Sequence, residues 1–461
     1  QAEGFKRTVR SGVVLEIQQT AQLDLRLELW VTAESIDVTA DAPLLATTES
    51  SQGQVINNKR IVDMPLNGRN YVQLALLSVG AVETANGARF STFSAAGQRA
   101  AQNNFMLDGI DNNNVQLAAQ GRQAETVQPS VDAIQEFKIS TNSFSAEYGR
   151  ATGAVVNATI KSGSNDLHGT VFEFLRNEAL DAKNFFDSPS SKRPPFKRNQ
   201  YGFSLGGPIV RNKTFFFGDY EWTDVRESRT ANNTIPTLAM RAGDFSAFRN
   251  IVYDPSTYNA QTRARQPFAN NRIPEARFDR VARQAIAWYP APQNGDLTQN
   301  YLANPPNIAD VGRGDIRVDH SIRANDTIYF RYSRQSLFEP SSPSLPPPAF
   351  GSDSTDFRNT GTNMGLVWSH TWSPRLLTTS RVGWNRLFTN EQPATTTNAN
   401  ATIGLRGVDN TTAGAPRFNI SDVTGLGIGA NLPNLNDSQT RQFVTDSTFV
   451  TGSHSLKFGA N

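Results

Sequence analysis

The 461-residue sequence contains no cysteine, which excludes disulfides and thiol chemistry but does not identify the compartment. It also lacks any apolar run of about 18 residues, so a membrane-spanning helix is excluded. Membrane-spanning strands remain open, because each needs only about 10 residues of alternating polarity. The net charge of +2 gives no electrostatic case for binding nucleic acid. The chain does contain 28 phenylalanines, which is unlike a disordered sequence.

Arrangements of side chains that support catalysis or metal binding are missing as well. The four histidines lie far apart and without ligand spacing, at His168, His320, His370 and His454. The polar group at Asp108 and 111–114 lacks the spacing of a calcium-binding loop and is more typical of a turn. No nucleophile stands in a pattern with a base, so we predict no catalytic residue, no metal site and no cofactor. We therefore interpret the chain as a non-enzyme.

The stretch from Phe105 to Asn165 organises the chain. It opens with a short apolar run, Asp108-Gly109 and a return, which predicts a tight hairpin with a type I′ turn. Residues 131–139 follow, as a single helical turn that runs into a strand. The stretch ends on a glycine and a strand of small residues at 153–161, a composition that suits a strand buried inside something larger.

These three runs, in this order and spacing, resemble the plug domain of TonB-dependent outer-membrane receptors. In that family the last run closes the plug, and the strands of the barrel begin directly after it. The resemblance implies a small α+β plug domain over residues 41–165. The alternative is an ordinary soluble α+β domain with two hairpins.

An earlier part of the same region carries a second motif of the family. Pro65-Leu66-Asn67-Gly68-Arg69 resembles the family's Pro-Leu-Asn-Gly-Arg motif and predicts a turn. A short helix is expected to follow, with Leu74 and Leu77 on one side. Arg69 is expected either to pair with a carboxylate of the barrel wall or to be a solvated turn arginine.

Two alternating segments, Val13–Ile17 and Ala21–Leu29, precede the plug region. Two strands do not make an independent core, so we interpret residues 1–40 as the tail of a β-sandwich whose beginning is missing. Residues 4–7 resemble the end of the carboxypeptidase-regulatory-like domain, which Oar-like members of the receptor family carry before the plug. The resemblance implies a sandwich without catalytic groups.

Residues 34–40 form a lone extended segment, and Pro43 ends any strand there. The segment is similar to the TonB box, the short strand that receptors offer to the energy-coupling protein. The resemblance implies partner-binding residues at Ile36, Asp37, Val38, Thr39 and Ala40. Such a segment adds a strand to the TonB-type partner through main-chain hydrogen bonds. The alternative is that the segment is the last strand of the sandwich, and the two interpretations are compatible.

After Ser164 the pattern changes to long strands in which aromatic and apolar residues alternate with polar ones. Examples are Tyr201, Phe203 and Leu205, Ile316 and Val318, Ile328, Phe330 and Tyr332, and Leu456 and Phe458. Short turns near 211–212, 323–325, 373–374 and 452–453 alternate with long connections at about 177–199, 223–313, 334–360 and 388–440. Outer-membrane barrels have short periplasmic turns and longer extracellular loops, whereas a soluble sandwich has no reason to place every long connection at one end.

About nine strands are expected, whereas receptors of this family close with about 22. We therefore predict a mostly β chain with a β-sandwich remnant, a small α+β plug domain and the first roughly nine antiparallel strands of an incomplete transmembrane β-barrel over residues 166–461. An incomplete set of strands leaves an open edge that lipid does not tolerate. The sequence is accordingly expected to be a fragment that is truncated at both ends.

In functional terms, the resemblance implies a receptor of the bacterial outer membrane that imports an unidentified extracellular ligand. The plug gates this uptake, a TonB-type energy-coupling protein drives it, and outer-membrane lipid surrounds the barrel. Two alternatives are a cell-surface binding or adhesion protein without transport, and a soluble secreted carbohydrate-binding all-β protein. Loops of mixed Asn, Arg and aromatic residues suit glycans, peptides and metal chelates alike, and no nucleic-acid partner is expected.

Overall fold

The computed structural model describes residues 8–11, 36–39, 52–84, 92–114, 123–182, 193, 195–228, 230–351, 354–395, 397–408, 411–429, 431–452 and 454–461. The strands predicted at Val13–Ile17 and Ala21–Leu29 lie outside these residues. The described chain is mostly β, as predicted, with one large sheet, one small sheet and three two-stranded pairs. Within these ranges, no helix is long and apolar enough to cross a membrane.

A five-stranded sheet with the order β3-β8-β9-β6-β7 forms the core of a small α+β domain. Its elements are β3 (Gln52–Asn57), α1 (Asn58–Asp63), η1 (Tyr71–Leu77), η2 (Ala100–Gln102), β6 (Asn104–Leu107), β7 (Ile110–Asp111), β8 (Ile134–Asn142) and β9 (Val155–Ile160), with a separate pair β4 (Ala81–Glu83) and β5 (Phe93–Ala95). The apolar side chains form one core, in which Tyr71 meets Phe137 edge-on with 5.2 Å between ring centroids. The predicted helix is the 3₁₀ helix η1, which buries Leu74 but leaves Leu77 exposed.

The hairpin between β6 and β7 has the predicted geometry. Asp108 has a φ of 53° and Gly109 has a φ of 76°. Positive φ at both central residues is the signature of a type I′ turn, whose twist matches that of the flanking strands. Pairing of Leu107 with Ile110 closes the hairpin directly around these two residues.

The second half of the chain is a nine-stranded antiparallel sheet in which neighbours in sequence are neighbours in space. Its strands are β10 (His168–Asn177), β11 (Phe196–Val210), β12 (Thr214–Ser228), β15 (Pro306–Arg323), β16 (Asp326–Glu339), β17 (Thr355–Ser373), β18 (Leu376–Pro393), β19 (Asn434–Thr451) and β20 (His454–Ala460). The predicted strand count is therefore confirmed. β10 and β20 form the two edges, so the described residues make an open curved sheet and not a closed barrel.

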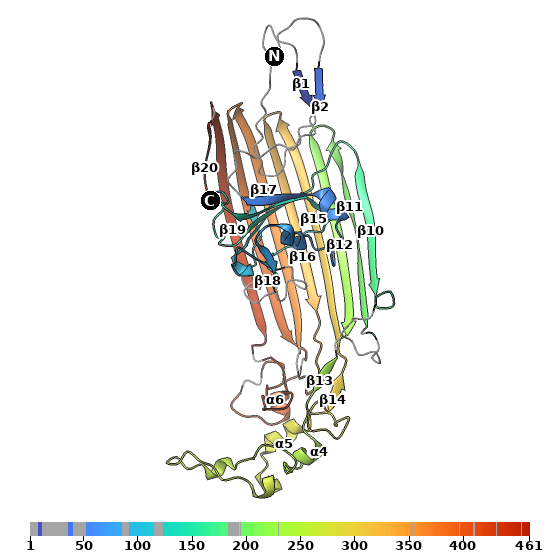
Figure 1. Ribbon diagram of the computed structural model, residues 1–461, viewed down its shortest axis with the longest axis vertical. Coiled ribbons are helices and arrows are strands. Elements are labelled where there is room, and N and C mark those ends of the chain that lie inside the picture. Colours follow the sequence, from blue (N-terminus) through green and yellow to red (C-terminus); the bar gives the residue numbers. More distant parts are fainter. Residues whose placement is uncertain are drawn as a thin grey trace.

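The long and short connections lie at opposite ends of this sheet, as predicted (Figure 1). Short turns occupy residues 211–213, 324–325 and 374–375, and a fourth short connection includes residue 452. The long connections, 178–195, 229–305, 340–354 and 394–433, are shorter than the predicted ranges because the strands continue further. At those strand ends the apolar alternation fades into polar residues, while the backbone pairing continues, so sequence pattern alone ends the strands too early.

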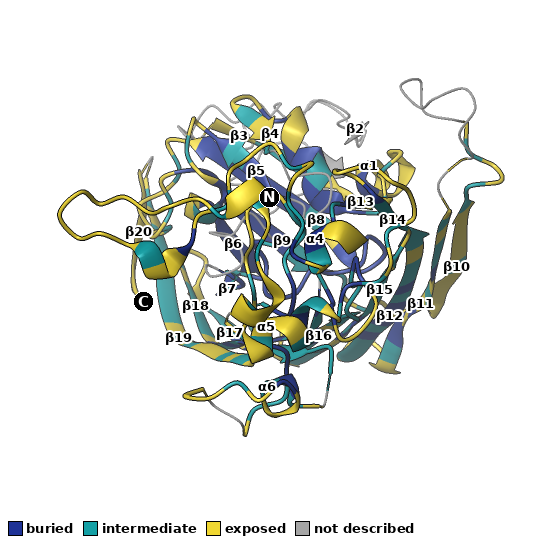
Figure 2. Cartoon of the chain, turned by 90° about the horizontal axis from the view of Figure 1, so that it is seen from below, coloured by how far each residue is buried: buried dark blue, intermediate teal, exposed yellow. Residues whose placement is uncertain are grey.

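On this sheet apolar side chains are exposed and polar side chains are buried, which is the reverse of the pattern in a soluble protein. Val171, Phe203 and Ile316 on its outer face are 87%, 51% and 55% exposed, whereas polar residues such as Ser204 and Asp315 on its inner face are buried. Figure 2 shows the small domain on the concave side of the curved sheet. An apolar face turned outward and a polar face turned inward is the arrangement of a strand that borders lipid.

Three of the long connections, 229–305, 340–354 and 394–433, pack together into a unit that we call the loop module. Their described parts contain β13 (Ala231–Asn233), α4 (Leu238–Arg241), η3 (Pro255–Thr257), η4 (Ala269–Asn271), η5 (Glu275–Arg277), α5 (Arg280–Ile286), β14 (Tyr301–Ala303) and α6 (Ala399–Thr402). Ile235, Leu345 and Leu426, one from each connection, meet in a shared apolar core. Backbone hydrogen bonds also join the connections, from Thr424 N to Thr234 O at 2.7 Å and from Gly427 N to Ala349 O at 2.8 Å. The module was not predicted from the sequence.

Candidate functional site

The predicted partner-binding segment forms β2 (Ile36–Thr39), while Ala40 lies outside the described residues. β2 is not a lone strand, because it pairs in parallel with β1 (Thr8–Ser11), with Thr8 opposite Ile36 and Ser11 opposite Thr39. Within the described chain this pair forms a sheet of its own, so one edge of β2 carries no strand. Such an edge offers main-chain donors and acceptors to a further strand.

The second predicted site, the Asp108-Gly109 turn, lies at the polar interface between the small domain and the large sheet. Arg331 of β16 is fully buried there, and its Nε lies 2.8 Å from Asp108 Oδ2 in an ion pair. Its Nη2 atom also donates to Leu107 O at 3.2 Å and to Asn363 Oδ1 at 2.6 Å. Arg317 Nη1 lies 3.5 Å from the other oxygen, Asp108 Oδ1. A buried carboxylate therefore faces two guanidinium groups of the sheet.

The small domain holds Asp108 in place from its own side. Ile160 N donates to Asp108 Oδ1 at 3.3 Å, and Asp108 N donates to Ala158 O at 2.8 Å. Gly109 N donates to Asn157 Oδ1 at 3.0 Å. The turn is thereby fixed on β9, which positions the carboxylate towards Arg331.

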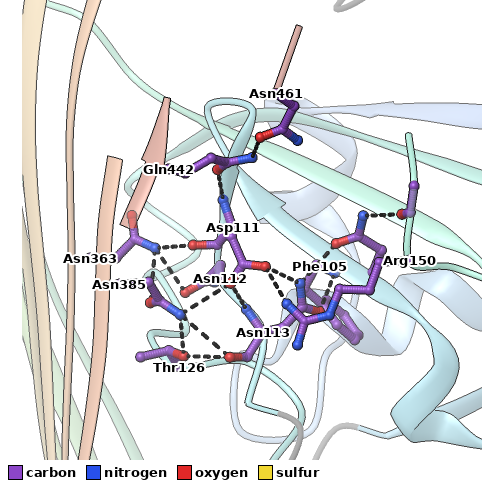
Figure 3. Close-up of polar contacts among 12 residues, drawn as sticks. Phe105, Asp111, Asn112, Asn113, Thr126, Arg150, Asn363, Asn385, Gln442 and Asn461 are labelled. Atoms are coloured by element: carbon purple, nitrogen blue, oxygen red, sulfur yellow. Dashed lines mark hydrogen bonds and ion pairs between the residues drawn. The ribbon is translucent and has the colours of Figure 1, made fainter. Parts of the chain in front are cut away.

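Asp111, just after the turn, is the centre of a network of neutral amides from the sheet (Figure 3). Asn363 Nδ2 donates to Asp111 O at 2.7 Å, and Asp111 N donates to Gln442 Oε1 at 3.0 Å. Asn385 Nδ2 donates to Asp111 Oδ1 at 3.3 Å, and Arg150 pairs with Asp111 Oδ2 at 2.8 Å. Within the polar run at 111–114, Asp111 therefore links β7 to β17, β18 and β19 by hydrogen bonds. In the described part of the chain, no group of three or more His, Asp or Glu side chains has an arrangement that could hold a metal ion.

Arg69 makes the contact with the wall that was one of its two predicted roles. Its side chain is 12% exposed, and its Nε lies 3.7 Å from Glu221 Oε2 on β12. It also pairs with Asp132 of the small domain, and its guanidinium stacks over Phe172 and Phe174 at 4.6 and 4.4 Å from the ring centroids. The interpretation as a solvated turn arginine is wrong.

A buried acid of the small domain lies beside the same interface. Glu125 accepts a hydrogen bond from the Tyr71 hydroxyl. Burial raises the pKa of Glu125 to about 8, although the Tyr71 hydrogen bond and the charge of Arg313 act in the opposite direction. Glu125 therefore holds a proton at neutral pH, in contrast to an acid in water.

The interface as a whole is ionic and amide-rich, and its most buried members were missed by sequence reasoning. Arg313, Arg317 and Arg331 point inward from β15 and β16. The sequence shows charged residues at alternate positions along β15. This pattern does not indicate which residues of the small domain, about 200 positions earlier in the chain, they contact. When a buried ion pair separates in water, both charges regain their hydration. An ionic interface therefore costs less free energy to open than an apolar interface does.

We expect Gly109→Val to lower the free energy of unfolding by about 1–3 kcal/mol, because a β-branched residue is strained at positive φ. A Cβ atom at this position would also lie 3.1 Å from Arg381 Nε. Urea unfolding of the protein in lipid vesicles measures the change. Gly109→Asn is the control, since asparagine tolerates positive φ, and it should cost less. Equal stability of the valine variant and the wild type would contradict the role of the turn.

This chain is similar to one family, one relative and two solved structures among known proteins. Residues 159–461 match the family described as "Outer membrane beta barrel domain". A stretch of 250 residues, 50% of this chain and 22% of the relative, is 26% identical to the TonB-dependent transporter Oar of Myxococcus xanthus.

Two solved structures share the fold. The outer membrane transporter YddB from Escherichia coli superposes with a TM-score of 0.52 at 11% identity, over 88% of this chain and 47% of that one. The siderophore receptor PirA from Acinetobacter baumannii gives a TM-score of 0.51 at 12% identity, over 90% of this chain and 48% of that one. The chain thus spans about half the length of these structures, and its match covers less than a quarter of the length of the relative.

Proposed function

Because this chain belongs to the outer membrane beta barrel domain family, we propose that it is part of a TonB-dependent receptor in which the small domain gates the barrel. The protein resides in the bacterial outer membrane. We assign residues 41–165 to the plug, residues 166–461 to the first strands of the barrel, and residues 1–40 to the end of a β-sandwich with the TonB-box-like strand.

The observation that carries this proposal is the reversed burial of the nine-stranded sheet around the small domain. An outer face that exposes Val171 and Phe203 is favourable in contact with lipid. In a soluble secreted carbohydrate-binding protein the same apolar face would be exposed to water, which is unfavourable. The inner face contacts the plug through Arg331, Glu221 and the Asp111 network instead of through an apolar core. A polar contact of this kind supports an insert that can be displaced to open a path.

Energy coupling is assigned to β2. The described part of the chain leaves one edge of the β1–β2 pair without a strand, which supports strand addition by a TonB-type protein. The ligand is an unidentified extracellular molecule that the receptor takes up. We infer no catalysis, in keeping with relatives that are transporters and receptors by name.

Val38→Pro should weaken binding of the purified periplasmic domain of the TonB-type protein by at least about tenfold, measured on the receptor expressed from its full gene. Proline removes one backbone donor and restricts the preceding Asp37, and strand addition depends on both. Ile36→Ala is the matched control, because it keeps the backbone and should change the affinity by less than about threefold.

The competing assignment, in which β2 only completes the sandwich, makes a different prediction. Both substitutions would then lower the melting temperature of the receptor, and neither would change the affinity of the remaining folded protein. Unchanged affinity of the Val38→Pro receptor for the TonB-type domain would therefore refute the coupling role.

A further inference from the structure

A hairpin of the loop module, residues 245–274 between α4 and α5, projects away from the rest of the molecule. We call it the arm. In Figure 1 it extends to the side at the bottom of the molecule, at the opposite end from β1 and β2. Backbone hydrogen bonds close it, from Asp254 N to Gln266 O at 2.8 Å and from Asn259 N to Ala264 O at 3.0 Å. After the arm, the chain returns to the apolar core of the module through Ala285 of α5 and Tyr289.

The arm is strongly basic, unlike the chain as a whole. It contains four arginines, no lysine and one acidic residue, Asp254, whereas the net charge of the whole chain is +2. Asp254 is already neutralised by Arg277, whose Nη1 and Nη2 atoms donate to its two oxygens at 2.7 Å each. Arg272 is paired with Asp244 at 2.9 Å. Within the described residues, Arg249, Arg263 and Arg265 are exposed and have no acidic partner.

Aromatic rings lie among these arginines. Tyr253 and Tyr258 are about half exposed, at 49% and 51%. The Arg265 guanidinium carbon lies 5.2 Å from the centroid of the Tyr258 ring. A cation–π contact of this kind holds the guanidinium group near the ring without using its N–H donors. The tip of the arm therefore presents guanidinium donors beside exposed aromatic rings.

From these features we propose that the arm binds an acidic polysaccharide outside the cell. Guanidinium groups match carboxylates with two parallel hydrogen bonds, and the exposed tyrosine rings offer flat apolar faces to sugar rings. A small ligand prefers a concave pocket, whereas a projecting hairpin suits a polymer that repeats the same charged group along its length. The arm lies at the end of the molecule that carries the long connections, at the opposite end from the short turns (Figure 1). The inference does not depend on energy-coupled uptake.

The probe for this proposal is alginate, a polymer of uronic acids, with neutral dextran as the uncharged comparison. We expect the detergent-solubilised full-length protein to bind alginate, to release it as salt is raised, and not to bind dextran. Arg263→Glu/Arg265→Glu should weaken alginate binding by at least about tenfold. Arg211→Glu/Lys213→Glu is the matched control, because it makes the same change of charge on exposed residues of a short turn at the opposite end, and it should leave the affinity within about twofold.

A third variant, Tyr258→Ala, separates stacking from charge. It should weaken alginate binding by about threefold, because it removes a ring face and the support of Arg265. Equal losses in the arm variant and the control variant would overturn the proposal, as would an arm variant that binds alginate like the wild type. Duplex DNA that binds as tightly as alginate would also overturn it, since the arm would then be a general polyanion surface.

Discussion

Arg331→Met should lower the free energy of unfolding by about 3–5 kcal/mol, because it leaves the Asp108 carboxylate buried without its nearest cation. Arg331 is fully buried, and besides Asp108 it satisfies Asn363 and Leu107 O. Methionine fills much of the same volume, so the loss reports the missing charge and hydrogen bonds more than a cavity. Arg317, at 3.5 Å from Asp108, offsets a part of the loss.

The measurement is urea unfolding of the protein in lipid vesicles. Arg375→Met is the control, since Arg375 is exposed in the short turn between β17 and β18, and its replacement should change stability by less than about 0.5 kcal/mol. The double variant Arg331→Met/Asp108→Asn should recover part of the loss, because no charge is then left buried. If Arg331→Met and Arg375→Met are equally stable, the buried ion pair does not hold the small domain to the large sheet.

The stability of the small domain should fall as pH rises from about 5 to about 8, because Glu125 must then lose its proton inside the domain. Burial raises the pKa of Glu125 from 4.5 to about 8 in the folded protein. The folded state therefore binds the proton more tightly than the unfolded state does. The stabilisation is fully present below pH 4.5, is lost between these two values, and changes no further above about pH 8. The total change amounts to about 3–5 kcal/mol.

Glu125→Gln tests this dependence, because the amide keeps the shape of the acid and does not titrate. Its free energy of unfolding should be nearly constant from pH 5 to pH 9, whereas that of the wild type falls. Glu83→Gln is the control, since Glu83 lies on β4 with its side chain exposed, and this variant should follow the wild type. A Glu125→Gln protein that keeps the slope of the wild type would show that another group carries it.

The parts of the fold that depend on local pattern were predicted from the sequence. Alternation of apolar and polar residues gave the nine strands, and the lengths of the connections gave the two ends of the sheet. The Asp108-Gly109 turn was predicted in detail, because only a few residue pairs favour positive φ at both positions. Arg69 was correctly offered as a partner of a wall carboxylate, although the carboxylate itself, Glu221, was not identified.

The parts that depend on distant pairing were not predicted. Arg331 and Leu107 are 224 residues apart, and the role of Asp108 as the carboxylate opposite Arg331 follows only from the docking of two domains. The pairing of β2 with β1 joins segments that are too short to carry a pattern. The loop module depends on single apolar residues, such as Ile235 and Leu345, within otherwise polar connections. Isolated apolar residues carry no periodicity, so no window of sequence marks them as a core.

The loop module also sets an order of events for biogenesis. Its core takes Ile235, Leu345 and Leu426 from three connections that are separated by complete strand pairs, so it closes only after β12 to β19 stand side by side. No single pair of strands contains this core, so a partly assembled sheet carries its connections as separate segments. In the proposed receptor, pairing of the strands therefore comes first, and the surface that carries the arm matures last.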